Sequence, residues 1–134
     1  MTVAAIALEQ ALAQPGCTCL LVSASQRQSA ELLGKVRSLA MAQRTEVGLE
    51  QLSVLSMRLA NDSRIISLPG RAEVIRGYTA DLLVMDEAAW IPDRLYESVR
   101  PMLAVSAGRL VALSTPYGRR GWFHAAWTGT EPWH

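Results

Sequence analysis

Two adjacent carboxylates, Asp86 and Glu87, directly follow an apolar run in the stretch LLVMDEAAW. A charged pair at the end of such a run costs free energy unless a cation meets it or water reaches it. At the tip of a strand the two side chains diverge, so one can hold the hydration shell of Mg²⁺ while the other orients or polarises an attacking water. The pair therefore indicates metal-assisted hydrolysis. The alternative is that both residues only begin a helix, where the helix dipole favours acidic side chains.

A second polar group, Ser114 and Thr115 followed by Pro116, ends the apolar run RLVAL. Hydroxyl groups here can hydrogen-bond the two carboxylates or sense a terminal phosphate, and the proline fixes the direction in which the chain leaves. On its own the tripeptide is equally typical of a strand that ends in a hydroxyl-capped turn. The two groups together favour a phosphate-handling site more than either does alone.

Helices and strands alternate around these residues. Apolar spacing predicts a helix over Thr2 to Ala13 and a strand within Cys17 to Ser25. Ser25 and Gln28 have the spacing of a capping box, which predicts a second helix to about Arg44. A β-hairpin that turns near Asn61 and Asp62 is predicted next, followed by a loop with one short strand over 69–81. The remaining predicted elements are a strand ending at Asp86, a helix from about Pro92 to Leu103, and a strand from Arg109.

The strands are continuous apolar runs, which is typical of a parallel sheet covered by helices on both faces. The fold class is therefore α/β. In such sheets ligands bind beyond the carboxyl ends of the strands. Three strand ends carry polar residues that we expect along one rim: Ser23 and Ser25, Asp86 and Glu87, Ser114 and Thr115.

The amino-acid composition limits which kinds of protein and site this chain can form. The 134 residues are half hydrophobic, which suits one globular domain, and the net charge of +1 neither predicts nor excludes a nucleic-acid partner. Cys17 and Cys19 lack further zinc ligands, so we expect two small buried side chains on one strand face, as in a reducing cytoplasm. No apolar run approaches the roughly 20 residues of a membrane span, and the N-terminal segment lacks the basic start of a signal peptide.

Four segments carry a resemblance to a known family: CLLVSASQRQSAELLGKVR, NDSRIISLPG, IRGYTADLLVMDEAAWIPDRLYESVRPML and RLVALSTPYGRRGWFHAAW. They resemble the large (motor) subunit of tailed-bacteriophage terminases, which package DNA into proheads. A DEAD-type helicase would show DEAD or DEAH and later SAT, whereas here the fourth position is Ala89 and the later motif is STP. The resemblance spans nearly the whole chain and implies a P-loop NTPase-type parallel sheet.

The resemblance implies roles for the residues at the strand ends. Asp86 is similar to the aspartate of the Walker B motif, which binds Mg²⁺ through water and so helps to bind ATP. Glu87 is similar to the catalytic glutamate. Ser114, Thr115 and Pro116 match the motif that couples hydrolysis to DNA movement.

Arg76 lies ten residues before Asp86, where some terminases carry an arginine finger that acts on a neighbour's nucleotide. The planar guanidinium suits that role because it stabilises charge developing on a phosphate. Arg71 is a weaker candidate of the same kind. For both, the alternative is a surface arginine in a loop.

The resemblance also implies ATP and Mg²⁺ as cofactors of the intact protein and double-stranded DNA as its substrate. The implied partners are the terminase small subunit, the portal protein and further copies of the same chain. The implied location is the cytoplasm of a bacterial host, with no membrane contact.

The phosphate-loop pattern G-x-x-x-x-G-K-[ST] does not occur among the 134 residues, nor does a nuclease domain. Residues 1–134 are therefore expected to be a partial P-loop ATPase domain without its phosphate-loop strand, which would lie beside 110–113 and leave an exposed edge. Such a chain alone is expected to bind ATP poorly and to hydrolyse it negligibly. The alternatives are a fragment of a DExx-type helicase motor, or a non-catalytic prophage remnant that serves as an interaction module.

The segment GRRGWFHAAW places arginines beside aromatic residues, a combination that can contact DNA. The favoured alternative is a helix whose Trp122, Phe123 and Trp127 pack on the sheet while Arg119 and Arg120 face solvent.

Overall fold

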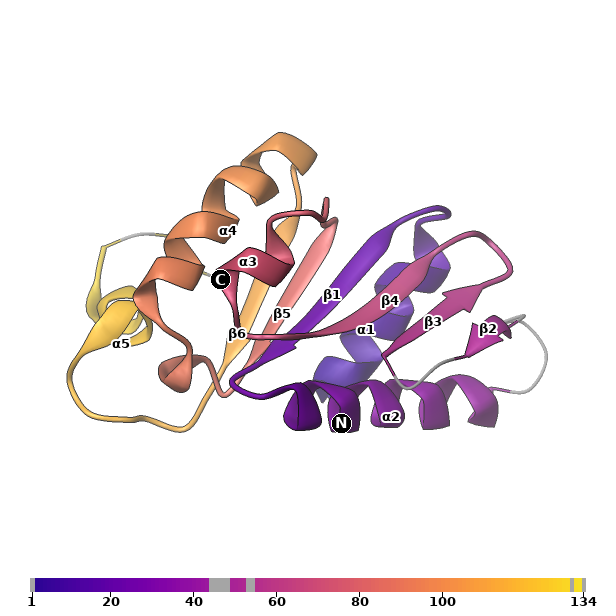
Figure 1. Ribbon diagram of the computed structural model, residues 1–134, viewed down its shortest axis with the longest axis horizontal. Coiled ribbons are helices and arrows are strands. Elements are labelled where there is room, and N and C mark those ends of the chain that lie inside the picture. Colours follow the sequence, from indigo (N-terminus) through magenta and orange to yellow (C-terminus); the bar gives the residue numbers. More distant parts are fainter. Residues whose placement is uncertain (1, 44–48, 53–54, 131, 134) are drawn as a thin grey trace.

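A six-stranded sheet forms the centre of the computed structural model, which describes residues 2–43, 49–52, 55–130 and 132–133 (Figure 1). The strand order is β2-β3-β4-β1-β5-β6. The parallel strands are β1 (Thr18–Ser23), β4 (Arg64–Pro69), β5 (Leu82–Asp86) and β6 (Arg109–Leu113), and the antiparallel ones are β2 (Leu49–Leu52) and β3 (Ser56–Leu59). The predicted α/β class is confirmed, with an antiparallel extension at one edge.

The extension begins with the predicted hairpin. β3 and β4 pair antiparallel and are joined by a turn at Asn61 and Asp62, where the Asn61 side chain accepts a hydrogen bond from the Ser63 amide at 3.1 Å. Asp62 adopts a positive φ of 68°, which aspartate tolerates better than most residues. The hairpin prediction is therefore confirmed; Ser53 and Val54, which begin the same alternating pattern, lie outside the described residues.

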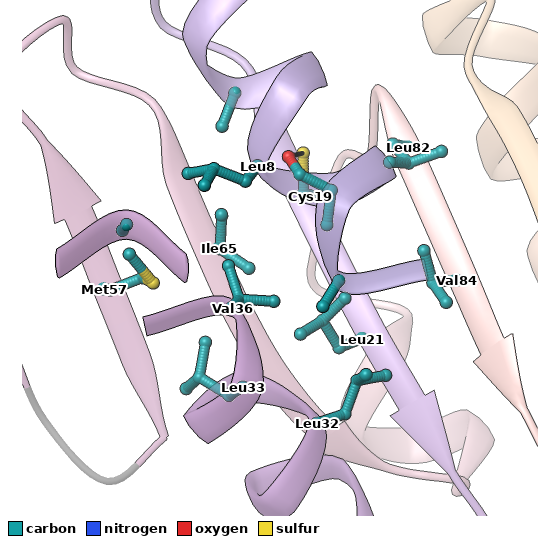
Figure 2. Close-up of a cluster of buried hydrophobic side chains, with 14 of the residues drawn as sticks. Leu8, Cys19, Leu21, Leu32, Leu33, Val36, Met57, Ile65, Leu82 and Val84 are labelled. Carbon is teal, nitrogen blue, oxygen red and sulfur yellow. Dashed lines mark hydrogen bonds between the residues drawn. The ribbon is translucent and has the colours of Figure 1, made fainter. Parts of the chain in front are cut away.

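One face of the sheet is covered by α1 (Thr2–Ala13) and α2 (Gln26–Ala42). Figure 2 shows Leu21 and Ile65 of the sheet among Leu8 of α1 and Leu33 of α2, and all four side chains are almost fully buried. Burial of this apolar surface stabilises the fold by roughly 25 cal/mol for each Å² removed from water. The α1–α2 layer therefore contributes a substantial share of the stability.

Cys17 and Cys19 are buried in this layer, as predicted, with their sulfur atoms 4.0 Å apart and no disulfide between them. Burial, with Cys17 as neighbour, raises the pKa of the Cys19 thiol above its ordinary value. The two residues therefore behave as small apolar core side chains.

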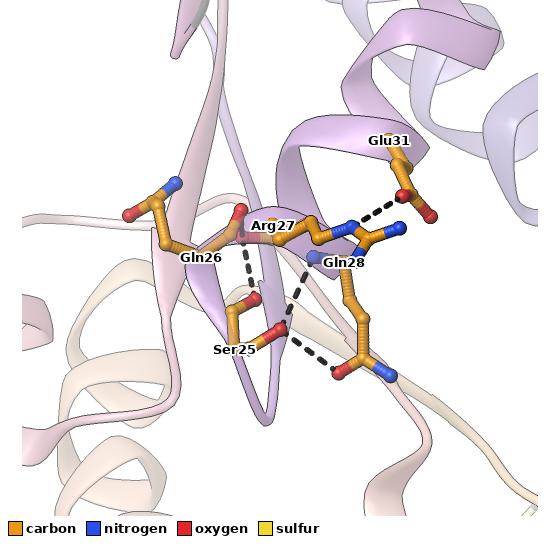
Figure 3. A network of polar contacts seen from close by, with 6 residues as sticks. Ser25, Gln26, Arg27, Gln28 and Glu31 are labelled. Carbon is orange, nitrogen blue, oxygen red and sulfur yellow. Dashed lines mark hydrogen bonds and ion pairs between the residues drawn. The ribbon is translucent and has the colours of Figure 1, made fainter.

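The start of α2 shows one half of the predicted capping box, the bond from the Gln28 amide to Ser25, while the Gln28 side chain meets the Ser25 hydroxyl and not the Ser25 amide. The Ser25 hydroxyl accepts a hydrogen bond from the Gln28 amide at 3.3 Å and lies 3.2 Å from the Gln28 side-chain oxygen (Figure 3). Such a cap satisfies amide groups that the first turn of a helix leaves without a partner. The helix ends at Ala42, and Arg44, where we expected it to end, lies outside the described residues.

Gly34 lies within α2, and a methyl group added there would meet no atom within 4 Å. Gly34→Ala is therefore expected to raise the free energy of unfolding by about 0.5–1 kcal/mol, because alanine loses less backbone entropy in a helix. Urea denaturation followed by circular dichroism measures this change. Gly16→Ala is the matched control: it also meets no atom, but its φ of +74° should make the same substitution destabilising. Equal effects at both positions would contradict the argument.

The other face is covered by α3 (Ala72–Ile75), α4 (Asp93–Ser106) and α5 (Gly121–Thr128). The core there includes Leu20, Leu83, Leu95 and Trp122. α4 agrees with the predicted helix, since Pro92 caps it and its buried residues recur at helical spacing, although it runs three residues beyond Leu103.

The short strand predicted within 69–81 is wrong, because this segment contains the single helical turn α3. Ala72 and Ile75 are three residues apart and both are buried, whereas Glu73 and Val74 between them are exposed. Helical spacing places the first and fourth residues on the same face, which a strand cannot do. Packing against the sheet therefore selects the helix.

β6 lies at the edge of the sheet in the described part of the chain, as predicted. Its residues 110–113 are half-buried, whereas residues 82–85 of the neighbouring β5 are buried. No helix in the described residues is long and apolar enough to cross a membrane.

Candidate active site

The parallel arrangement brings the predicted polar strand ends to one rim of the sheet. β5 lies between β1 and β6, with Val22 opposite Met85 and Asp86 opposite Leu113. Continuing the first register by one residue places Ser23 beside Asp86. The prediction of a common rim is therefore confirmed.

Glu87 leaves this rim in a left-handed backbone conformation, with φ 52° and ψ 47°. For a residue with a Cβ atom this conformation costs about 1–2 kcal/mol, so the surrounding contacts must hold it. It turns the chain from β5 into the 3₁₀ turn η1 (Ala88–Trp90), in which the Trp90 amide donates to the Glu87 carbonyl oxygen at 2.9 Å. Asp86 and Glu87 thus precede a short 3₁₀ helix, as the alternative interpretation expected of a helix start, but the Glu87 side chain does not cap it.

The Glu87 carboxylate contacts the hydroxyl groups that follow β6. Its Oε2 atom lies 3.5 Å from Ser114 Oγ and 3.5 Å from Thr115 Oγ1. The Ser114 hydroxyl also accepts the Ala89 amide at 3.1 Å and lies 2.8 Å from the Thr115 carbonyl oxygen. Because Ser114 has one hydroxyl hydrogen, it donates mainly to that nearer carbonyl, and Thr115 remains available to Glu87. The two polar groups singled out in the sequence are therefore in contact.

Asp86 presents one carboxylate oxygen to its own backbone and leaves the other available. Its Oδ1 atom accepts the Glu87 amide at 3.0 Å. Among the residues that the structure describes, no basic side chain forms an ion pair with Asp86 or Glu87. Two half-buried carboxylates without a cationic partner create a negative potential that attracts a cation.

The neighbouring Ser23 hydroxyl adds a further oxygen to this corner of the rim. It is fully buried and has no hydrogen-bond partner among the residues that the structure describes. Strand alternation places it on the same face of the sheet as Asp86. A buried hydroxyl without a partner is costly, so a water or a hydrated ion is the expected neighbour.

This donor set fits Mg²⁺. The ion prefers oxygen ligands, keeps several waters, and is usually held by one or two carboxylates together with substrate phosphates. In the described residues no group of three or more His, Cys, Asp or Glu side chains forms an all-protein metal site, so the remaining ligands would be water and substrate. Asp86 is the residue that would hold the ion.

The N-terminus of α1 points toward the same rim. A turn at 14–17 connects the end of α1 to the amino end of β1, so the helix runs antiparallel to that strand. Its 12 residues are about 18 Å long and the six residues of β1 about 20 Å, so the start of the helix reaches the level of Ser23 and Asp86. The helix dipole there favours an anion.

Arg76 and Arg71 are exposed and flank α3 on the opposite face of the sheet from α1. Arg71 follows β4, whose last residue Pro69 pairs with Ser23 at the rim. In the described residues neither arginine forms a hydrogen bond or ion pair with Asp86 or Glu87.

The C-terminal helix only partly follows the sequence interpretation. Trp122 is buried and its indole nitrogen donates to the Ile91 carbonyl oxygen at 3.0 Å, and Phe123 is half-buried. The prediction that Trp127 packs on the sheet is wrong, because its side chain is 84% exposed. Five residues along a helix rotate the side chain by about 140°, which takes Trp127 away from the face that Trp122 buries. Arg119 and Arg120 are exposed, as expected.

Two residues beside the site were missed in the sequence. Trp90 and Tyr117 stack with ring centroids 3.7 Å apart, at positions three residues after Glu87 and two after Thr115. The similar distances of Trp90 and Tyr117 along the chain from Glu87 and Thr115 are the one feature of the sequence that indicates contact between the two rings.

The comparisons of sequence and of structure both find phage large terminases. The chain is 27% identical to the terminase large subunits of Thermus virus P23-45 and Thermus phage G20c, over 88% of this chain and 28% of each relative. It superposes on the large terminase ATPase domain of Thermus phage P74-26 with a TM-score of 0.75, 25% identity, and coverage of 87% of this chain and 54% of that one. The chain has the fold of a phage large-terminase ATPase domain. The large terminase of another thermophilic bacteriophage shares the fold alone, with a TM-score of 0.70 at 11% identity, over 92% of this chain and 34% of that one.

The likeness to terminase large subunits therefore extends over most of the chain, which spans little more than a quarter of the curated relatives' length. No protein-family model matches it. The resemblance to terminases identified in the sequence is confirmed by these relatives and structures.

Proposed function

We propose that residues 1–134 are part of the P-loop ATPase domain of a terminase large subunit, in which ATP hydrolysis drives double-stranded DNA into a prohead. The observation that carries this proposal is the contact of Glu87 with Ser114 and Thr115 at the rim, beside Asp86. The similarity to terminase ATPase domains supports the same assignment.

Each residue at the rim has a role that its chemistry suits. Asp86 would hold Mg²⁺ through water, and the bound ion would neutralise charge on the phosphates of ATP. Glu87 would accept a proton from the attacking water and orient it. The N-terminus of α1 would face the phosphates with its free amide groups.

Coupling to DNA movement would begin at the same contact. Thr115 Oγ1 lies 3.5 Å from Glu87 Oε2 and Ser114 donates to the Thr115 carbonyl oxygen, so a change in the charge near Glu87 would alter the hydrogen bonds of the loop 114–116. Arg76 is exposed at the end of α3, which suits an arginine finger that reaches the nucleotide of a neighbouring copy. A ring of such copies, the terminase small subunit and the portal protein are the partners that this role requires, in the host cytoplasm.

The test of this proposal is a chimera with the Thermus phage P74-26 ATPase domain. The part of this chain that matches that domain, 87% of its residues, replaces the corresponding 54% of the domain, which supplies the remaining part. ATP-dependent phosphate release by a chimera that is folded by circular dichroism supports the proposal. A folded chimera without phosphate release, beside an active P74-26 domain, contradicts it.

A separate prediction concerns the metal. Mn²⁺, a paramagnetic substitute for Mg²⁺, is expected to broaden the amide NMR signals of Asp86, Glu87 and Ser114 of this chain before those of other residues. Asp86→Asn should remove the selective broadening, because the amide lacks the charge that attracts the ion. Glu97→Gln is the matched control, since Glu97 is a carboxylate on α4, outside the rim, and its loss should change nothing. Uniform broadening in all three proteins would contradict a metal site at Asp86.

A further inference from the structure

The stacked rings of Trp90 and Tyr117 lie on the two loops that carry the candidate catalytic residues. The ring planes are inclined by only 22°. Trp90 is 52% exposed and Tyr117 39% exposed, so neither ring contributes to the hydrophobic core. Two rings stacked with centroids 3.7 Å apart are in direct van der Waals contact, and this contact joins the two loops.

The stack is the middle one of three contacts between these loops. On one side, Ser114 accepts the Ala89 amide and lies against Glu87. On the other side, the Trp122 indole donates to the Ile91 carbonyl oxygen, and the Trp122 amide donates to Asp93 Oδ1 at 2.9 Å. The segment after Glu87 and the segment after Ser114 are therefore joined at three places.

Arg120 also contacts the ring of Tyr117. Its guanidinium carbon lies 5.3 Å from the centre of the ring, within the range of a cation–π interaction. Tyr117 is thus held by both Trp90 and Arg120, and its ring can shift only if one of these contacts breaks.

The backbone conformation of Glu87 depends on contacts such as the stack of Trp90 on Tyr117. Its left-handed conformation is unfavourable for glutamate, so neighbouring groups must maintain it. The Trp90 amide donates to the Glu87 carbonyl oxygen at 2.9 Å, so the residue that carries the stacked ring is bonded to the Glu87 backbone. The hydroxyl contacts at 3.5 Å are too long to fix the carboxylate by themselves.

We propose that Trp90 and Tyr117 are positioning residues: their stack holds the Glu87 carboxylate against Ser114 and Thr115. The catalytic meaning of this arrangement rests on the proposed function, but the arrangement itself does not. Movement of either loop separates the rings and displaces Glu87, so the stack links the state of the loop 114–117 to the position of the carboxylate.

The test compares Trp90→Ala with Trp127→Ala in the 134-residue chain. Trp127 is an equally suitable tryptophan to remove, since it is 84% exposed on the same part of the molecule. Trp90→Ala is expected to shift the NMR signals of the Glu87 carboxyl carbon and the Ala89 amide, with a midpoint of thermal unfolding within about 4 °C of the unchanged chain. Trp127 lines a pocket together with Ala89 but has no part in the stack, so Trp127→Ala should leave the Glu87 signal in place. Equal spectra around Glu87 for the two variants would overturn the proposal.

A conservative variant separates the stack from other effects of the substitution. Trp90→Phe retains an aromatic ring and is expected to restore most of the Glu87 and Ala89 shifts. If Trp90→Phe gives the same spectrum as Trp90→Ala, ring stacking is not what positions Glu87, and the proposal is wrong.

The same samples distinguish this inference from the proposed function. If Mn²⁺ selectively broadens the rim of the unchanged chain but Trp90→Ala leaves Glu87 in place, the positioning role fails and the metal site stands. If Trp90→Ala displaces Glu87 and the chimera is inactive, the positioning role stands and the ATPase assignment fails.

Discussion

Glu87→Gln in the chimera is expected to lower ATP turnover by at least about 100-fold, the usual effect of removing a general base. The substituted amide has almost the same size and can still accept a hydrogen bond from Thr115, so the loops should keep their geometry. It cannot accept a proton from the attacking water. Phosphate release measured with malachite green at saturating ATP gives the turnover.

The matched control for this experiment is Glu97→Gln in the same chimera. Glu97 lies on α4, outside the rim, so its loss should leave the turnover unchanged. A Glu87→Gln chimera that hydrolyses ATP at the rate of the control would remove Glu87 from the mechanism. A fall in turnover with a parallel loss of the folded state would be detected by circular dichroism.

Leu21→Ala is expected to lower the free energy of unfolding by about 2–5 kcal/mol, the largest effect on stability that we predict. Leu21 lies on the central strand β1 and is fully buried under α1 and α2 (Figure 2). Its truncation removes apolar contacts and leaves a cavity that the strands on both sides of β1 cannot close. Because domains are stable by only about 5–15 kcal/mol, a large part of the stability is lost.

Urea denaturation followed by circular dichroism measures this loss as a lower midpoint with an unchanged slope. Val105→Ala is the matched control, since Val105 is 88% exposed on α4 and its truncation leaves no buried cavity. A difference between the two variants of less than about 1 kcal/mol would contradict the view that β1 is the centre of the core.

The sequence by itself determined the main elements and the common rim. Continuous apolar runs ending in polar residues identify β1, β5 and β6, because a strand buried on both faces leaves few positions for polar side chains. Ser25 with Gln28 fixed the start of α2, since a helix start has its own hydrogen-bonding requirement. Parallel strands share one carboxyl edge, so Ser23, Asp86 and Ser114 were expected along one rim, whereas the strand order that sets their spacing came from the structure.

Only the tertiary structure decided the features that depend on contacts between distant segments. The turn α3 replaced a predicted strand because Ala72 and Ile75 bury together against the sheet. Trp127 became exposed because the direction of α5 is set by Trp122, which binds the backbone of Ile91.

The left-handed conformation of Glu87 and the stack of Trp90 on Tyr117 also belong to this second group. The backbone preference of glutamate disfavours the left-handed conformation. Local sequence patterns do not predict the stack. Periodicity and capping report how a residue interacts with its near neighbours along the chain, and they carry no information on what a loop meets across the sheet. The identities of the site residues were therefore readable in the sequence, whereas their mutual geometry is a property of the folded chain.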